Sequence, residues 1–340
     1  MNLHLVVLLS TLLLAGLSPL VHGNSSAPDV IDDSYAKPGE SVDIGGGRAL
    51  NLRCSGEGKP VVLLEAGSNA DASTWYRVQP QLALLTRVCA YDRAGYGFSD
   101  EGTYPRDLDA YAADLHALIR ATQIPTPVIL VGHSLGSNIV RKYARQYPDE
   151  VAGIVLVDPP EQGSDDPMPQ EWKSQDASML AQRESVLSAC ARAADAGDAD
   201  TLKQKCVRPP PPWMSTSVAS AMARTKAKPS YWRTLRSELA QNTDVFSTPV
   251  PTDESYGSIP LVLLRAPLPD AGMPPEVLRV IEDKRSQTHA RILSASTRSS
   301  AIDVPDTSHD IQLDRPETVV SAVRTLLGTV DAADGRHTRE

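Results

Sequence analysis

The chain has 340 residues, of which 41% are hydrophobic, 22% are charged and four are cysteine. These fractions are those of a globular protein, so they exclude a disordered chain and a protein with many membrane spans. The formal net charge of −9 argues against nucleic acid as a partner, because phosphate binding needs clustered Lys and Arg and the sequence has no such cluster. We expect one large domain with an insertion.

Residues 1–23 are typical of a secretory signal peptide. Leu5 to Leu20 is almost uncharged and rich in leucine, and small or neutral residues follow as far as Gly23. We expect cleavage near Gly23, export to the periplasm or the medium, and no stable membrane anchor after cleavage. The alternative is an uncleaved anchor, because the apolar run is slightly long for a signal peptide.

Short apolar runs alternate with helix-like stretches in two parts of the chain, 24–160 and 258–330. Continuous runs of Val, Ile and Leu are typical of strands that are covered on both faces, so the pattern predicts a parallel sheet with helices around it. Ligand sites of such sheets lie at the carboxyl ends of the strands. The runs are 61–64, 128–131, 154–157 and 261–264, and helices are expected over 107–121 and 138–147.

Residues 161–257 break this alternation and predict a helical cap inserted into the sheet domain. They carry Ala-rich amphipathic stretches and four consecutive prolines but no strong strand signal. We expect their three tryptophans to anchor the cap to the core, because large aromatic side chains dominate contacts between surfaces. Lining of a pocket is the alternative. The tryptophans are Trp172, Trp213 and Trp232, and a polar tail is expected over 331–340.

The segment Gly132 to Gly136 reads Gly-His-Ser-Leu-Gly and joins an apolar run to a predicted helix. In this strand–turn–helix context the pattern G-x-S-x-G lifts the serine hydroxyl above the sheet on a sharp turn. The N-terminus of the helix offers free N–H groups to a developing oxyanion. We therefore predict Ser134 as a nucleophile and the N–H of Leu135 as an oxyanion donor.

A serine nucleophile needs a base in the same cleft, and elimination selects His309. It lies in a polar loop after a candidate strand, 301–304, and before a helix that starts at Pro316. The other histidines lie in the signal segment, in the tail, beside the nucleophile, or in predicted helices where a satisfied or solvated role is expected: His4, His22, His337, His133, His116 and His289.

A second oxyanion donor usually comes from the loop after the third strand. Glu65 to Asn69 directly follows the run 61–64 and occupies that place. We assign the second donor to the backbone N–H of Ser68, with Asn69 as the alternative.

Three motifs together resemble the α/β-hydrolase superfamily. They are Tyr91 to Ser99, the segment around Ser134, and His309 to Pro316, and they occur in the family's order. The resemblance covers about residues 40–160 and 258–328 and leaves the cap unmatched. It implies an α/β fold with a mostly parallel sheet of about eight strands, and a structural role for Asp92 and Arg93. It also argues against the family's dehalogenases and epoxide hydrolases, which use Asp as nucleophile.

The acid partner of the histidine stays open between two aspartates. Many relatives carry it in a Gly-x-x-Asp turn that this chain lacks after the run 261–264. Asp158 and Asp270 both satisfy the chain order Ser–Asp–His. We prefer Asp158, because it ends a buried strand and is held rigidly, whereas Asp270 follows two prolines in a loop.

Four cysteines in an exported chain predict disulfides. The family's strand order puts the second strand, ending near Cys54, beside the fourth, which contains Cys89, so the resemblance implies that these two pair. Cys190 and Cys206, both within the cap, are the other candidate pair.

The serine, the histidine and the aspartate predict acyl transfer on a small molecule with a carbonyl group. Hydrolysis of a carboxylic ester is the leading prediction. Amide or peptide hydrolysis, C–C bond hydrolysis and perhydrolysis are alternatives on the same residues, since a fold does not fix a substrate. A catalytically inactive binding module is a further alternative. No cofactor and no metal are expected, because the sequence has no HExxH and no ligand-like spacing. The sequence carries no signal for the oligomeric state.

Overall fold

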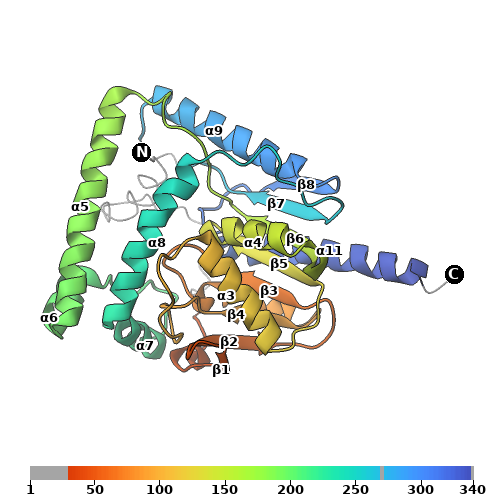
Figure 1. Cartoon of the computed structure of the whole chain (residues 1–340), viewed down its shortest axis with the longest axis horizontal. Coiled ribbons are helices and arrows are strands. Elements are labelled where there is room, and N and C mark those ends of the chain that lie inside the picture. The colour runs from red at the N-terminus through yellow and green to blue at the C-terminus, as the bar shows by residue number, and fades with distance from the viewer. Residues whose placement is uncertain (1–29, 269–271, 338–340) are drawn as a thin grey trace.

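The computed structural model describes residues 30–268 and 272–337, and an eight-stranded sheet forms its centre (Figure 1). The strand order is β1-β2-β4-β3-β5-β6-β7-β8, and β2 runs antiparallel to β1 and β4 while β3 to β8 are mutually parallel. The predicted α/β fold with a mostly parallel sheet is confirmed. The strands are β1 (Glu40–Asp43), β2 (Ala49–Ser55), β3 (Val62–Glu65), β4 (Val88–Tyr91), β5 (Val128–His133), β6 (Val151–Val157), β7 (Leu261–Arg265) and β8 (Ser299–Asp303).

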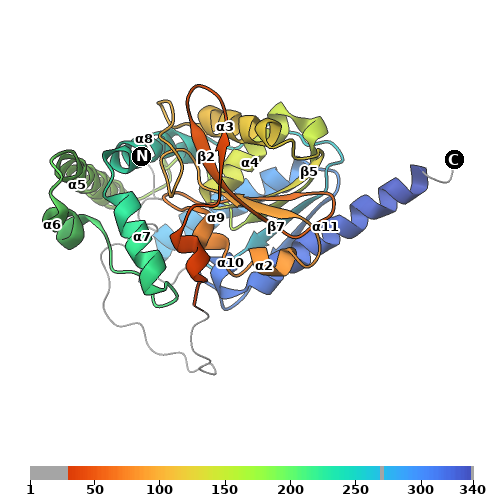
Figure 2. The same ribbon diagram turned by 90° about the horizontal axis from the view of Figure 1, so that it is seen from below.

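Helices cover both faces of the sheet, as the continuous apolar runs require. One face packs against α3 (Leu108–Ala121), α4 (Leu135–Gln146) and α9 (Pro275–Ser294), and the other against α2 (Gln79–Leu82) and α11 (Pro316–His337). Figure 2 shows α3 and α4 on one side of the sheet and α2, α11 and the short α10 (Ile311–Asp314) on the other. Neighbouring residues of a strand serve opposite faces, so the apolar runs fill two cores at once.

Four α-helices stand between β6 and β7, where the sequence predicts a cap. They are α5 (Gln170–Asp195), α6 (Ala199–Thr201), α7 (Thr216–Lys226) and α8 (Pro229–Ser247), and they lie together to one side of the sheet, at the left of Figure 1. Trp213 stacks on Tyr76 at 5.1 Å between ring centroids. Trp232 shares a buried cluster with Tyr96, and Trp172 packs against the cluster that contains Val277 of α9. All three tryptophans therefore join the inserted helices to the sheet domain.

Two predicted boundaries differ from the structure. Helix α4 begins at Leu135 rather than at residue 138, because Ser134 is its N-cap and the weak helix formers Gly136 and Ser137 fill its first turn. Helix α11 continues to His337, so residues 331–337 of the predicted polar tail are helical. The predicted signal segment 1–23 and Asp270 lie outside the described residues.

Both predicted disulfides are confirmed. Cys54 and Cys89 face each other directly in the antiparallel pair β2–β4, with 4.1 Å between their Cα atoms. Cys190 of α5 bonds to Cys206, and their Cα atoms are 5.7 Å apart. Disulfides persist in oxidising compartments, which is compatible with export. Within the described ranges, no helix has both the length and the apolar character of a membrane span.

Candidate active site

The segment around Ser134 forms a strained turn between β5 and α4. Ser134 has φ 51° and ψ −122°, a left-handed conformation that non-glycine residues seldom adopt. Its N–H donates to the carbonyl oxygen of Val157 at 3.0 Å, which fixes the turn to β6. Since Leu135 is the first residue of α4, its N–H has no acceptor within the helix. The turn thus presents a serine hydroxyl beside a backbone donor that has no acceptor in the described part of the chain.

The two glycines of the segment are needed for close packing. A Cβ atom on Gly132 would lie 2.4 Å from the carbonyl oxygen of Gly136, and one on Gly136 would lie 2.5 Å from that of Glu65. Both contacts are with backbone atoms, which cannot move aside cheaply. Only glycine lets the helix approach the loop after β3.

The structure brings His309 and Asp158 together. His309 lies in the loop after β8, Asp158 directly follows β6, and 2.6 Å separate Nδ1 of the imidazole from Oδ2 of the carboxylate. The other carboxylate oxygen accepts from the N–H of Ala266 at 3.0 Å and from the guanidinium of Arg285. Sequence reasoning missed Arg285, because a basic residue within α9 reads as an exposed charge.

The contact between His309 and Asp158 changes the protonation of both groups. Burial lowers the pKa of His309, but the hydrogen bond and charge of Asp158 outweigh it, so the pKa lies above the ordinary value. Burial raises the pKa of Asp158, and the His309 hydrogen bond and charge together with Arg285 bring it below the ordinary value. Asp158 is therefore an anion at neutral pH. An imidazole that donates from Nδ1 to this anion keeps Nε2 free to accept a proton.

His133 ties the loop of His309 to the strained turn. Its Nε2 lies 3.0 Å from the carbonyl oxygen of His309, and its Nδ1 lies 3.3 Å from Nε2 of Gln312. A carbonyl only accepts, so Nε2 of His133 carries the proton and Nδ1 accepts from the Gln312 amide. Burial, followed by the charge of His309, lowers the pKa of His133 to about 4, so the ring is neutral. The ring centroids of His133 and His309 are 4.7 Å apart, which brings the predicted base next to the neighbour of Ser134.

The loop after β3 passes against Ser134. A Cβ atom on Gly67 would lie 3.2 Å from Cβ of Ser134. The N–H of the next residue, Ser68, has no acceptor among the described residues, whereas the N–H of Asn69 donates to Oε1 of Glu238 at 2.9 Å. The alternative donor Asn69 is therefore not supported, because its N–H is already taken.

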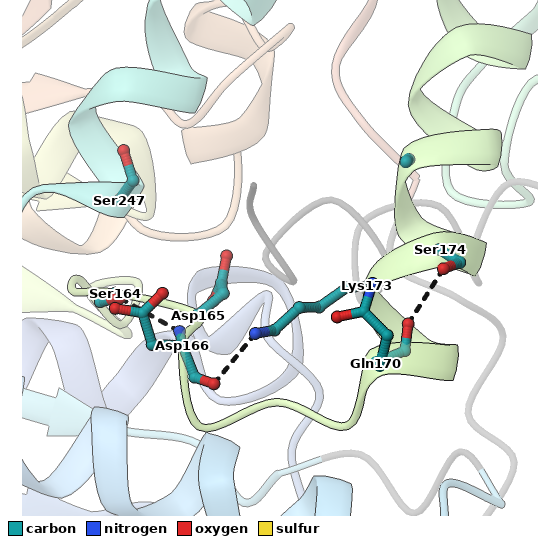
Figure 3. Close-up of a pocket in the computed structure, with 8 residues that line it drawn as sticks. Ser164, Asp165, Asp166, Gln170, Lys173, Ser174 and Ser247 are labelled. Carbon is teal, nitrogen blue, oxygen red and sulfur yellow. Dashed lines mark hydrogen bonds between the residues drawn. The ribbon is translucent and has the colours of Figure 1, made fainter.

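The described cavities lie away from these residues. One of about 400 Å³ opens where α5 and α8 meet the segment after β6, and in Figure 3 Lys173 reaches toward it and donates to the carbonyl oxygen of Asp166 at 2.9 Å. A second, of about 560 Å³, shares Ser164 and Asp166 with the first. Neither contains a predicted site residue. In the part of the chain that the structure describes, no group of three or more His, Cys, Asp or Glu side chains could hold a metal ion.

Comparison with known proteins identifies a family and several relatives. The family model described as alpha/beta hydrolase fold matches residues 59–242. An uncharacterized protein of Mycobacterium bovis is 35% identical over 106 residues, 31% of this chain and 30% of that protein. A 2-(acetamidomethylene)succinate hydrolase of Mesorhizobium japonicum is 33% identical over 132 residues, 39% of this chain and 46% of that protein. The chain thus matches less than half the length of either curated relative.

A solved structure shares the fold over most of its length. The thermophilic esterase from Thermogutta terrifontis aligns with a TM-score of 0.56 and 21% identity, over 86% of this chain and 99% of that chain. At this identity the likeness is one of fold alone.

Proposed function

The chain belongs to the alpha/beta hydrolase fold family, and we propose that it is a serine hydrolase that cleaves carboxylic esters with Ser134, His309 and Asp158. The observation that carries the proposal is the distance of 2.6 Å between Nδ1 of His309 and Oδ2 of Asp158. His309 also lies next to His133, the residue that precedes a serine in the strained conformation of a nucleophile turn. A nucleophile, a base and an orienting acid are the three parts that acyl transfer through serine needs.

In the proposed reaction, Ser134 Oγ bonds to the carbonyl carbon while its proton passes to Nε2 of His309. The tetrahedral intermediate places its oxyanion toward the N–H groups of Ser68 and Leu135, neither of which donates to another acceptor within residues 30–268 and 272–337. Collapse breaks the bond to the alcohol, which leaves with the proton from His309. Water then attacks the acyl-enzyme by the same route and restores Ser134 and the carboxylic acid.

Asp158 is the proposed acid, and three contacts support it. The N–H of Ala266 and the guanidinium of Arg285 hold one carboxylate oxygen, while the other faces His309. Such a carboxylate keeps the imidazole in one tautomer and stabilises the imidazolium that forms during attack.

An ester is the proposed substrate, because an alcohol is a better leaving group than an amine or a carbanion. It therefore makes the least demand on the protonated His309 as proton donor. The substrate is proposed to be a small molecule with a carbonyl group, because Ser134 needs a carbonyl carbon to attack. Export is proposed as well, and the two disulfides support it.

The test combines a covalent probe with a substrate panel. A fluorophosphonate should label Ser134, as peptide mapping would show, and p-nitrophenyl esters of rising acyl length should be hydrolysed with saturation. Ser134→Ala should abolish both, while the exposed control Ser255→Ala should change neither. A folded wild-type protein that resists the probe and hydrolyses no ester would refute the proposal and favour a binding module. Labelling of Ser134 together with turnover of only amides or C–C substrates would assign one of these two substrate classes in place of esters.

A further inference from the structure

Helix α8 of the insertion makes hydrogen bonds to the loop that carries Ser68. Tyr231, Glu238 and Asn242 project from one face of the helix, at spacings of seven and four residues. The Tyr231 hydroxyl donates to Oδ1 of Asn69 at 2.6 Å, and Nδ2 of Asn242 donates to Oγ of Ser68 at 3.3 Å. Three side chains from the cap thus contact two adjacent loop residues.

Glu238 makes the central contact, and its side chain is fully buried. Its Oε1 accepts from the hydroxyl of Ser68 at 2.7 Å and from the N–H of Asn69 at 2.9 Å. Its Oε2 accepts from the hydroxyl of Tyr111 at 2.6 Å and from Nη2 of Arg93 at 3.1 Å. Four donors satisfy the four lone-pair sites of the carboxylate, which is what a buried carboxylate requires.

Arg93 extends this contact to the peptide unit before Ser68. Its guanidinium is buried between Glu238 and Glu65, and it donates to the carbonyl oxygens of Ala66 at 2.6 Å and Gly67 at 2.7 Å. In a trans peptide the N–H points opposite to the carbonyl of the same unit. Because Arg93 holds the carbonyl of Gly67, the N–H of Ser68 points away from Arg93.

The peptide units on both sides of Ser68 are therefore fixed. Arg93 holds the one before it, and Glu238 holds the one after it through the N–H of Asn69. Asn69 has φ 56°, a left-handed conformation that the Tyr231 hydroxyl stabilises through the Asn69 side chain. A free loop could rotate these units and turn the Ser68 donor away from the oxyanion.

We propose that Glu238 is a positioning residue that keeps the N–H of Ser68 directed at the oxyanion, so that the oxyanion hole is complete only while α8 is docked. This inference rests on the proposed function, in which Ser68 supplies the second donor. If the contact of Glu238 served only to stabilise the cap against the core, its loss would leave the oxyanion hole intact. Positioning of Ser68 and stabilisation of the cap therefore differ in their effect on transition-state binding.

The principal variant is Glu238→Gln, which keeps the shape of the side chain. It leaves one acceptor oxygen for the four donors, and its amide N–H₂ group faces the donors that the second carboxylate oxygen served. We expect kcat to fall by about tenfold to a hundredfold with little change in KM, because an oxyanion donor acts mainly in the transition state. The affinity of an alkyl boronic acid, which forms a tetrahedral adduct with serine, should fall by the same factor.

The matched control is Arg233→Gln on the same helix. Arg233 pairs with Glu101 of the sheet domain at 2.8 Å on the surface, so its loss also removes an ionic contact between cap and core. Because it leaves Ser68 and Asn69 untouched, kcat and boronate affinity should stay within twofold of wild type. Tyr231→Phe is a milder variant that removes only the hydroxyl on Asn69, and it should lower kcat several-fold.

Hydrogen exchange of the peptide that contains residues 65–72 tests the positioning independently of turnover. Glu238→Gln should speed its exchange, and Arg233→Gln should not. Unchanged exchange in Glu238→Gln would overturn the inference, and so would faster exchange with unchanged kcat and boronate affinity. If Glu238→Gln does not fold, the inference would be overturned by a Tyr231→Phe variant whose boronate affinity and hydrogen exchange both equal those of the wild type. Failure of wild-type Ser134 to react with a fluorophosphonate would instead refute the proposed function, and with it the proposed role of the contact.

Discussion

The imidazole of His133 donates a hydrogen bond to the carbonyl oxygen of His309 across 3.0 Å, so the residue before the proposed nucleophile holds the backbone of the proposed base. The two residues are 176 positions apart in the chain. Gln312 completes the arrangement by donating to the other nitrogen of His133. The distance between Ser134 and His309 therefore depends on a buried, neutral ring that takes no part in proton transfer.

His133→Phe should lower kcat by about tenfold to a hundredfold. The phenyl ring keeps the volume but frees the His309 loop, and a displacement of about 1 Å at a reacting group can cost a hundredfold in rate. The lost hydrogen bond should also reduce the free energy of unfolding by about 1 kcal/mol, the usual size for one hydrogen bond, because the half-buried carbonyl of His309 loses its donor. Steady-state kinetics and urea unfolding measure the two effects.

The matched control is His116→Phe. His116 stacks on Tyr147 at 4.0 Å between ring centroids, in α3 and away from His309. Its replacement should leave kcat unchanged. Equal kcat values for His133→Phe and His116→Phe would show that His133 does not position the base.

Replacement of the acid should separate the two aspartates that chain order leaves open. Asp158→Asn removes the charge that faces His309 and should lower kcat by about 10⁴, the scale known for serine proteases. Asp270→Asn should stay near the wild-type rate. Both variants should be assayed on the same p-nitrophenyl ester, and a large loss confined to Asp270→Asn would reverse the assignment.

The parts of the site that were predictable from sequence are those with a local signal. Ser134 stands in a strand–turn–helix pattern, and His309 follows a short strand in a polar loop, so both could be proposed without knowledge of tertiary contacts. The sequence favours Asp158 over Asp270, because Asp158 directly follows a buried strand, but whether that strand end faces His309 is information that only a structure contains. The sequence does not predict the start of α4 at Leu135, because helix propensity is low at Gly136. Close packing against the backbone of Glu65 requires glycine at that position.

Glu238 could not be predicted for a different reason. It lies 170 positions from Ser68 in an amphipathic helix, where an acidic residue normally faces solvent. Its burial follows from the way α8 packs against the segments after β3 and β4, where it contacts Ser68 and where Thr234 leaves room only for glycine at position 95. No periodicity in the insertion specifies that contact.

The pH profile of kcat/KM should show an acid limb with a midpoint above 6.5. The hydrogen bond and charge of Asp158, aided by Asp310 and Glu161, outweigh the burial that lowers the pKa of His309 and so raise it above that value. The base acts only when neutral, so kcat/KM falls as the pH decreases through this pKa. In Asp158→Asn the midpoint of the residual activity should move down. A wild-type midpoint at or below 6.5 would contradict the contact between His309 and Asp158.

Removal of the cap disulfide should destabilise the protein. Cys190 and Cys206 are separated by 16 positions, and closing a loop of about that length stabilises a protein by about 3 kcal/mol in the chain-entropy model. The bonded pair also packs in the cluster that holds Leu235 and Tyr231 of α8, next to the contact with Asn69. Cys190→Ser with Cys206→Ser should therefore lower the midpoint of thermal unfolding.

Activity should be lost earlier than the global fold in this double variant, because the packing beneath α8 is weakened while the eight-stranded sheet is untouched. A temperature series of kcat, set beside thermal unfolding followed by circular dichroism, measures the gap between the two midpoints. The control is Cys54→Ser with Cys89→Ser, which removes a disulfide within the sheet domain and should lower both midpoints together. Equal gaps in the two double variants would show that the cap disulfide does not support the position of α8.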